Sequence, residues 1–306
     1  MKVIFMGTPY FSIPTLNNII SNKYFDIVAV YTQPPKPQGR GLNLQKTPIH
    51  CLAEEHNLLV KHPASLRKSE VVEEIASFKP DIIVVVAYGL ILPEEVLNIP
   101  KYGCINLHPS ALPQYRGAAP LQRTILGGEV LSSICVIKMD KGVDSGDILN
   151  KKDFTLAKDI TFSQLHDYTS NVGADLIIEV LKNIANIIPI TQDHENATYA
   201  NKILKSEAQI NFSLDEIVPI DRKIRALNPI PGTYFIYKFE QIKIKEANVS
   251  FESHSYTPGT IINSEFWIAC NGGILKPIIL QRPGKKAMHI VDFVKGFNFD
   301  IDNIIL

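Results

Sequence analysis

An amide and an imidazole stand two residues apart at the end of one apolar run. The run Cys104–Leu107 is typical of a buried strand, and Pro109 ends it just after His108. Because alternate residues of a strand point to the same face, Asn106 and His108 are expected to face the same way. They would then lie at the carboxyl edge of a sheet, where open α/β sheets bind ligands. Taken alone, the pair favours a structural histidine at a strand end over a catalytic one.

A second candidate element is an acidic loop that glycines interrupt. It follows a strand expected over Ile134–Met139 and carries Asp140, Asp144 and Asp147. Carboxylates so close together suit a cation, but no Glu stands where a calcium-binding EF-hand loop requires one. A solvated turn is therefore the simplest interpretation of this loop alone, and we expect no metal site.

Together the two elements fit one reaction, the attack of an amine on an activated amide. The oxyanion that forms needs hydrogen-bond donors, which Asn106 and a protonated His108 can supply. The attacking nitrogen must also lose a proton, and Asp144 can help His108 to relay it. We therefore predict that Asn106, His108 and Asp144 are the catalytic residues.

The amino-terminal part of the chain must hold these residues. Short apolar runs alternate there with helical patterns, which predicts an α/β fold with a mostly parallel sheet. A long amphipathic segment, Phe162–Ile184, closes this part, and we place a catalytic domain over residues 1–189. Helices are expected to start at Pro48, near Glu70 and after Pro93, and strands are expected at Val3–Met6, Ile27–Tyr31, Ile82–Ala87 and Cys104–Leu107.

The carboxyl-terminal part has a different pattern. A polar segment without a steady period predicts a linker over residues 190–207. A helix is expected at Ile217–Leu227, followed by a turn and by strands at Thr233–Tyr237 and Gln241–Ala247. Breaks such as Gly272-Gly273 separate further short runs, so residues 208–306 should form a small β-barrel.

Several other classes of protein are disfavoured. The GxGxxG spacing is absent around Gly7, and no P-loop, HExxH or GxSxG motif occurs, which argues against NAD, nucleotide triphosphate, zinc-protease and serine-hydrolase chemistry. The four cysteines form no CxxC pair, so neither a zinc site nor a disulfide framework is expected, in keeping with a reducing cytoplasm. The apolar run Ile82–Leu92 is too short to span a membrane. The formal net charge is zero, so bulk charge indicates neither DNA nor RNA as a partner.

Several motifs in combination resemble those of the methionyl-tRNA formyltransferase family. The similarity extends through nearly the whole chain. The motifs are Gly7–Phe11 (GTPYF), Val85–Pro93 (VVAYGLILP), Asn106–Ser110 (NLHPS), Tyr115–Pro120 (YRGAAP), Asp140–Asp147 (DKGVDSGD), Asn228-Pro229 and Pro283–Met288 (PGKKAM). The resemblance implies a Rossmann-like formyltransferase domain followed by a smaller OB-like barrel that contacts tRNA. It also implies formyl transfer from 10-formyltetrahydrofolate to methionine on initiator tRNA, with Asn106, His108 and Asp144 as the catalytic trio.

The resemblance further assigns binding residues. Two segments match the folate-binding parts of the family, and they comprise Tyr88, Gly89, Leu90, Ile91 and Leu92 together with Ser110, Ala111, Leu112 and Pro113. The segment Pro34–Pro48, which we expect to be a mobile basic loop, matches an insertion that approaches the acceptor stem. Its candidate tRNA contacts are Lys36, Arg40 and Lys46, and further candidates are Lys202, Lys205, Arg282, Lys285 and Lys286. Without the resemblance, these cations would be ordinary surface charges. We expect a monomer that binds initiator methionyl-tRNA and no DNA.

Two residues depart from the family pattern. Ala111 stands where Leu is usual, which trims apolar contact near the folate, and Ile230 stands where Trp is common, which should affect packing more than chemistry.

Three alternatives remain at this point. The first is a formyltransferase for a UDP-linked amino sugar, and the second is one for glycinamide ribonucleotide. The runs Arg116–Pro120 and Gly142–Asp147 argue against the amino-sugar enzyme, and the barrel after Lys205 argues against the glycinamide enzyme. The third is a non-catalytic folate- or RNA-binding module, which should have lost one of the trio.

Overall fold

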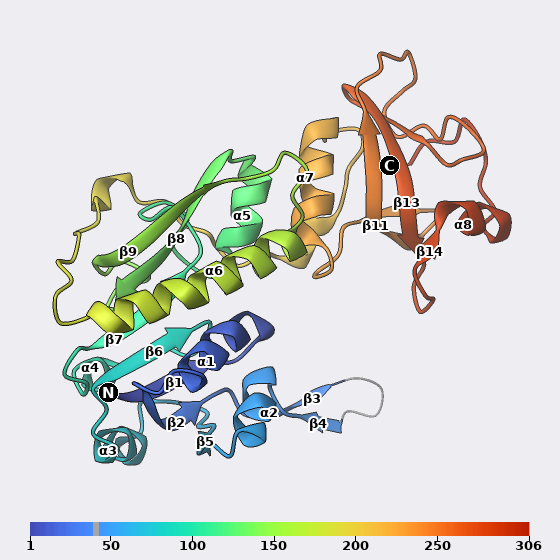
Figure 1. The fold of residues 1–306 in the computed structure, drawn as a ribbon. Helices are drawn as coiled ribbons and strands as arrows, with labels where there is room; N and C mark the ends of the chain where they lie inside the picture. The colour runs from blue at the N-terminus through green and yellow to red at the C-terminus, as the bar shows by residue number, and fades with distance from the viewer. Residues whose placement is uncertain (39–42, 306) are drawn as a thin grey trace. The chain divides into compact units, whose positions relative to one another are not determined.

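The computed structural model describes residues 1–38 and 43–305 of the 306-residue chain. The fold divides into two compact units (Figure 1). The N-terminal unit comprises Met1–Pro120, Leu131–Thr155 and His166–Ala200. The C-terminal unit comprises Leu121–Val130, Leu156–Leu165 and Asn201–Leu306.

The N-terminal unit is built on a seven-stranded sheet of order β5-β2-β1-β6-β7-β8-β9. The pairs from β5 to β7 are parallel, while β8 and β9 are antiparallel to their neighbours, so the predicted mostly parallel sheet is confirmed. The strands are β1 (Lys2–Gly7), β2 (Asp26–Tyr31), β5 (Val60–Lys61), β6 (Ile82–Val86), β7 (Cys104–His108), β8 (Leu131–Lys138) and β9 (Ile148–Thr155).

Helices cover this sheet because its central strands are apolar on both faces. Every residue of β6 is buried, as is usual for a strand between crossover helices. Thr47 caps α2 by accepting a hydrogen bond from the His50 amide at 3.0 Å, and Pro48 follows at the first helical position. The helical segments are η1 (Tyr10–Ser12), α1 (Ile13–Ile20), α2 (Pro48–Glu55), α3 (Ser69–Ser77), α4 (Glu94–Leu97), α6 (Phe162–Asn183) and η2 (His194–Asn196).

Helix α6 lies directly on the strand that carries the predicted catalytic pair. A Cβ atom added at Gly173 would be 2.6 Å from Leu107 Cδ2, so only glycine allows this approach. Ser170 Oγ also donates to the Phe11 carbonyl at 2.8 Å. The first contact packs α6 against β7 at Leu107, and the second joins α6 to η1.

The basic segment after Gln33 contains two short paired strands, which corrects the expectation of a loop throughout. Strands β3 (Lys36–Gln38) and β4 (Asn43–Gln45) pair antiparallel, with Lys36 opposite Gln45. Proline and glycine near this segment disguised the strands, since proline is tolerated only at exposed edges of a sheet.

The C-terminal unit is an antiparallel half-barrel, in agreement with the predicted OB-like barrel. Its sheet has the order β10-β11-β13-β12, and β14 pairs with β13. A core rich in Phe side chains fills it, including Phe235, Phe266 and Phe293. Its elements are α5 (Pro120–Gly127), which begins at the last residue of a segment of the N-terminal unit, η3 (Lys205–Ala208), α7 (Ile217–Leu227), β10 (Tyr234–Tyr237), β11 (Glu240–Ser250), β12 (Ile268–Cys270), β13 (Gly273–Gln281), β14 (Met288–His289) and α8 (Ile290–Gly296).

The segment expected to be a linker begins with residues bonded into the N-terminal unit. Ile190 pairs with Ile148, and Tyr199 forms a parallel bridge with Arg116. The boundaries 1–189, 190–207 and 208–306 stay a prediction. In the described part of the chain, no helix is long and apolar enough to cross a membrane.

Ile230 does not have the packing role that the sequence suggested. Its side chain is 78% exposed, so it contributes little buried apolar area to the half-barrel.

Candidate active site

The three predicted catalytic side chains converge at the carboxyl end of β7. Parallel pairing sets Asn106 beside Val85, and antiparallel pairing sets His108 beside Cys135. Asn106 Nδ2 donates to Asp144 Oδ1 at 3.3 Å, and His108 Nδ1 lies 3.5 Å from Asp144 Oδ2. The structure therefore brings together an amide, an imidazole and a carboxylate from two segments of the chain.

The loop that carries Asp144 is folded by its own side chains. Asp140 accepts hydrogen bonds from the Gly142 amide at 2.9 Å and from Ser145 Oγ at 2.7 Å. A Cβ atom at Gly146 would fall 1.8 Å from the Lys138 carbonyl oxygen, so glycine is required there. Asp140 thus orders the turn. Among residues 1–38 and 43–305, no group of three or more His, Cys, Asp or Glu side chains could hold a metal ion.

The Asp144 carboxylate is oriented by a backbone amide as well as by side chains. Gly117 N donates to Asp144 Oδ2 at 2.8 Å. Gly117 has φ +118°, and a Cβ atom there would lie 3.0 Å from the Ala200 carbonyl oxygen. Asp144 itself has φ +50°, a conformation that few non-glycine residues adopt. The carboxylate is therefore held between a main-chain donor and the two predicted catalytic side chains.

His108 has its tautomer set by a main-chain oxygen. The side chain is buried, and Nε2 lies 2.9 Å from the Tyr115 carbonyl oxygen. Because a carbonyl can only accept, Nε2 carries a proton. Nδ1 is then the nitrogen turned toward Asp144.

A buried thiol beneath the site takes no part as a nucleophile. Cys135 Sγ lies 3.2 Å from the Ser110 carbonyl oxygen, and burial raises the pKa of the Cys135 thiol to about 11. At neutral pH the thiol stays protonated, and a protonated thiol is a poor nucleophile.

The first predicted folate segment is fixed mainly through its backbone. Thr8 Oγ1 donates to the Tyr88 carbonyl at 2.8 Å, and Gln33 Nε2 donates to the Gly89 carbonyl at 3.1 Å. Tyr88 and Leu92 pack their side chains into the apolar core, where burial raises the pKa of the Tyr88 phenol. Ile91 is 74% exposed and Leu90 is half-buried. The surface available to a ligand here is therefore main chain plus the side chains at 90 and 91.

The second predicted folate segment leads directly out of β7. Ser110 is fully buried, and its Oγ donates to the Gln114 carbonyl at 2.7 Å. Leu112 packs in a small cluster with Cys135, Ile137 and Ile148, whereas Ala111 is half-buried. Ala111, which departs from the family pattern, is thus partly accessible to solvent.

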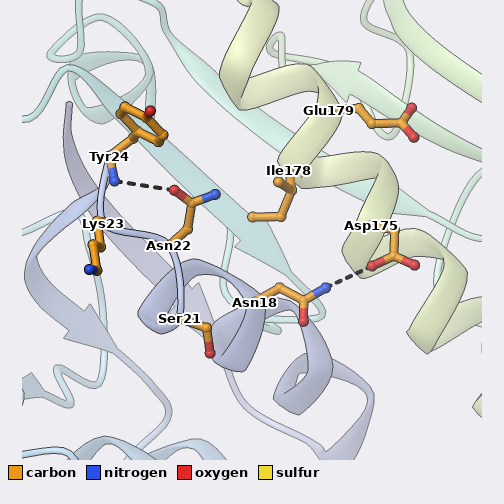
Figure 2. Close-up of a pocket in the computed structure, with 8 residues that line it drawn as sticks. All are labelled: Asn18, Ser21, Asn22, Lys23, Tyr24, Asp175, Ile178 and Glu179. Atoms are coloured by element: carbon orange, nitrogen blue, oxygen red, sulfur yellow. Dashed lines mark hydrogen bonds between the residues drawn. The ribbon is translucent and has the colours of Figure 1, made fainter.

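Two hollows of the N-terminal unit differ in their relation to these segments. A small cavity of about 180 Å³ lies between the Thr8-Pro9 turn and the β3–β4 hairpin, and its lining includes Gln33, Lys36 and Lys46. A larger open hollow of about 840 Å³ lies between α1 and α6. Figure 2 shows the residues that line it, among them Asn18, which donates to Asp175. None of the predicted site residues that the structure describes lines this larger hollow.

The predicted tRNA-binding cations are mostly exposed. Lys36 Nζ donates to Gln33 Oε1 at 2.8 Å, and Lys46 pairs with Glu54 at 2.6 Å. Arg40 lies outside the described residues. In the C-terminal unit, Arg282 forms a paired contact with Glu240, with Nε 2.7 Å from Oε1, while the exposed candidates are Lys202, Lys205, Lys285 and Lys286.

Sequence reasoning missed a buried amide next to Asp144. Gln192 belongs to the polar segment interpreted as a linker, yet only 4% of it is exposed. Its Nε2 donates to the carbonyl oxygens of Asp144 and Gly146. No local pattern distinguishes such a residue from a solvated one, because its partners are distant in sequence.

Comparison with known proteins follows the same division of the chain. Residues 1–181 match the sequence profile of the formyl transferase family, and residues 202–298 match that of the formyl transferase C-terminal domain. The chain is 49% identical over 303 residues to the methionyl-tRNA formyltransferase of Rickettsia bellii (strain RML369-C), covering 99% of each chain.

Solved structures resemble the fold at lower sequence identity. An N-formyltransferase from Helicobacter canadensis, in complex with folinic acid and dTDP-3-aminofucose, gives a TM-score of 0.68 at 20% identity over 90% of this chain and 99% of that chain. The methionyl-tRNA formyltransferase from Clostridium thermocellum gives a TM-score of 0.59 at 21% identity, covering 83% of this chain and 95% of that chain. At this identity the likeness concerns the fold alone.

Proposed function

Because this chain belongs to the methionyl-tRNA formyltransferase family, we propose that Asn106, His108 and Asp144 are its catalytic residues. The enzyme transfers a formyl group to the amino group of methionine carried by initiator tRNA. One observation carries the assignment of the trio. The Asp144 carboxylate lies within 3.3 Å of Asn106 Nδ2 and 3.5 Å of His108 Nδ1, so one acid meets both of the other groups.

Asn106 and His108 stabilise the charge that develops during transfer. The Asn106 amide has two N–H groups and directs one of them to Asp144, which leaves the second for the formyl oxygen. His108 Nε2 is engaged by Tyr115, so a proton on Nδ1 is the one that it can share with the formyl oxygen. Both donors thus aim at an oxygen that becomes negative when the amine attacks the formyl carbon.

Asp144 serves the proton transfer. The attacking amine must give up a proton as its bond to carbon forms, and a carboxylate beside an imidazole can accept that proton. The same proton is needed by the folate nitrogen when its bond to the formyl carbon breaks. His108 and Asp144 can pass it between the two nitrogens, so the reaction consumes and releases no net proton within the site.

The formyl donor of this family is folate-derived, and we propose 10-formyltetrahydrofolate as the donor for this chain. The two folate segments fit such a ligand in one respect. In the first segment, Thr8 and Gln33 fix the carbonyls of Tyr88 and Gly89, and the partly exposed Leu90 and Ile91 offer apolar contact for a flat ring. We assign Tyr88–Leu92 and Ser110–Pro113 to this role, with no metal.

The other substrate is tRNA, and its contacts are proposed from charge and position. We assign them to Arg40, Lys36 and Lys46 in the N-terminal unit and to Lys202, Lys205, Lys285 and Lys286 in the C-terminal unit. Basic side chains on exposed segments suit phosphate contacts, which position RNA without reading its sequence. We further propose that the enzyme acts as a monomer in the cytoplasm, where initiator tRNA is charged.

A direct assay tests this proposal. Purified enzyme is incubated with 10-formyltetrahydrofolate and methionylated initiator tRNA, and the released amino acid is analysed by mass spectrometry. Parallel reactions contain a UDP-linked amino sugar or glycinamide ribonucleotide, and an Asp144→Asn variant serves as the catalytic control. Formylmethionine from the tRNA reaction alone, absent with Asp144→Asn, is the expected result. Formyl transfer only to a rival amine would overturn the substrate assignment, and full activity of Asp144→Asn would overturn the trio.

A further inference from the structure

We infer that Gln192 is a positioning residue for Asp144, an inference that rests on the catalytic role proposed above for that carboxylate. Gln192 touches none of the groups that react. Its side chain bonds to the backbone of the loop that carries Asp144, and it links that loop to the buried Arg116.

Every polar atom of the Gln192 side chain is used. Nε2 donates to the Asp144 carbonyl at 2.9 Å and to the Gly146 carbonyl at 2.6 Å. Oε1 accepts from Arg116 Nε at 3.1 Å and from Arg116 Nη2 at 2.7 Å. The two side chains are only 4% and 3% exposed, so water cannot replace these bonds easily.

The partners also decide which way the amide points. Two carbonyl oxygens can only accept and a guanidinium can only donate, so the amide nitrogen must face the loop and its oxygen must face Arg116. The reversed amide would place oxygen against two oxygens and N–H groups against N–H groups. The Gln192 amide therefore fits its site in a single orientation, as expected of a side chain that positions the Asp144 loop.

Arg116 links this amide to the other support of Asp144. Its Nη2 lies 3.1 Å from His194 Nδ1, and its backbone pairs with Thr198 and Ala200 at 2.9 and 2.7 Å. The next residue is Gly117, whose amide holds Asp144 Oδ2. The same short segment thus fixes the carboxylate directly and, through Gln192, fixes the main chain that bears it.

Asp144 requires such support because its backbone is unfavourable. A non-glycine residue at φ +50° is retained only where its surroundings over-determine the conformation. Without the two hydrogen bonds from Gln192, the turn around Asp144 can relax and carry the carboxylate away from Asn106 and His108. A misplacement of roughly 1 Å in a reacting constellation can cost on the order of 10²-fold in rate.

Two substitutions separate the two halves of the Gln192 contact. Gln192→Met keeps a similar volume and removes all of its hydrogen bonds. Gln192→Glu keeps an acceptor for Arg116 but replaces the donor to Asp144 and Gly146 by an oxygen. We expect both variants to lower kcat by about 10- to 100-fold while the KM values for folate and tRNA change less than threefold. The pH profile of kcat should also shift, which a merely structural residue would not cause.

A matched control removes a similar amide elsewhere. Asn228 Nδ2 donates to the carbonyls of Ile224 and Ile244 at 2.8 and 3.0 Å, within the C-terminal unit. Asn228→Ala should lower the melting temperature and leave kcat at 25 °C unchanged. All variants are assayed well below their melting temperatures, and circular dichroism confirms that they are folded.

The outcomes are distinguishable. A wild-type kcat in Gln192→Met overturns the positioning role. A wild-type kcat in Gln192→Glu alone shows that contact with Arg116 suffices, and this too overturns the inference that the donor to the loop matters. If Gln192→Met does not fold, the Glu variant, which keeps its acceptor for Arg116, decides. A wild-type rate in Asp144→Asn would instead remove the proposed role of Asp144 itself, whatever the Gln192 variants do.

Discussion

The backbone amide of Gly117 donates to Asp144 Oδ2 at 2.8 Å, so a main-chain group from one segment orients a carboxylate that stands 27 residues further along the chain. The contact depends on glycine for two reasons. The residue has φ +118°, and a side chain would meet the Ala200 carbonyl. Gly117 has no reactive side chain, yet the orientation of the Asp144 carboxylate depends on it.

Gly117→Ala is expected to impair both stability and activity. The positive φ and the 3.0 Å approach of Cβ to Ala200 O should cost about 1–3 kcal/mol of unfolding free energy. Any relief of that strain moves the amide away from Asp144, so kcat should fall as well. Denaturant unfolding and steady-state kinetics measure the two effects. Gly296→Ala is the control, because nothing lies within 4 Å of a Cβ there, and it should change neither. Unchanged kcat in Gly117→Ala would show that this hydrogen bond is dispensable.

His108→Ala should lower kcat by about 10²- to 10⁴-fold, the usual contribution of a general acid–base group. The fold should persist, since the side chain makes polar contacts with Tyr115 and Asp144 rather than filling an apolar core. Single-turnover rates with saturating substrates give the comparison. The exposed His56, at the end of α2, provides the control variant His56→Ala, for which we expect wild-type rates. A wild-type rate in His108→Ala is incompatible with the mechanism.

Tyr88→Phe should leave the KM for folate unchanged and should not destabilise the enzyme. The Tyr88 hydroxyl is buried and has no hydrogen-bond partner within the part of the chain that the structure describes. Removing a buried hydroxyl that makes no bond relieves a desolvation cost of about 1–3 kcal/mol at most. Folate titration and thermal melting test this expectation. A large rise in KM would mean that the hydroxyl itself contacts the folate.

Replacing Lys285 and Lys286 together by alanine should weaken the use of tRNA and reduce its salt dependence. Each phosphate contact that is lost lowers the slope of log affinity against log salt by about 1. The KM for tRNA is measured between low and physiological salt, with the KM for folate as internal reference. Lys23→Ala, which removes an exposed cation of the N-terminal unit, should keep the wild-type slope. An unaltered slope in the double variant would exclude these lysines from the RNA contact.

The stability of the protein should decrease at acidic pH, in part because Glu207 becomes protonated. Its carboxylate pairs with Arg123 at 2.6 Å, and this hydrogen bond holds the pKa of Glu207 below the ordinary value of 4.5. A depressed carboxyl pKa adds stability above the unfolded value, and that stability is lost as the pH falls through the folded value. Because the pair is partly exposed, the gain is about 1 kcal/mol or less. The melting temperatures of wild type and Glu207→Gln should therefore differ at pH 7 and converge as the pH falls below 4.5. A difference that persists in acid would assign the stabilisation to another group.

The sequence alone predicted the chemistry and determined most of the elements. Strand periodicity placed Asn106 and His108 on one face of β7, and the glycine-interrupted loop supplied Asp144, because these features depend on residues close together in the chain. The helix at Ile217–Leu227 begins and ends where its pattern predicted. Local pattern was sufficient in each of these cases.

Only the tertiary structure decided how the trio is held. Gln192 and Arg116 are 76 residues apart, and the segment that the sequence predicts to be a polar linker supplies one side chain of a buried hydrogen-bonded pair. The Tyr88 ring, expected beside folate, packs into the core, and the basic loop after Gln33 forms a hairpin. The physical reason is common to all of these. A polar or aromatic side chain acquires its role from partners that only chain folding brings within a few ångströms, and no periodicity along the sequence encodes them.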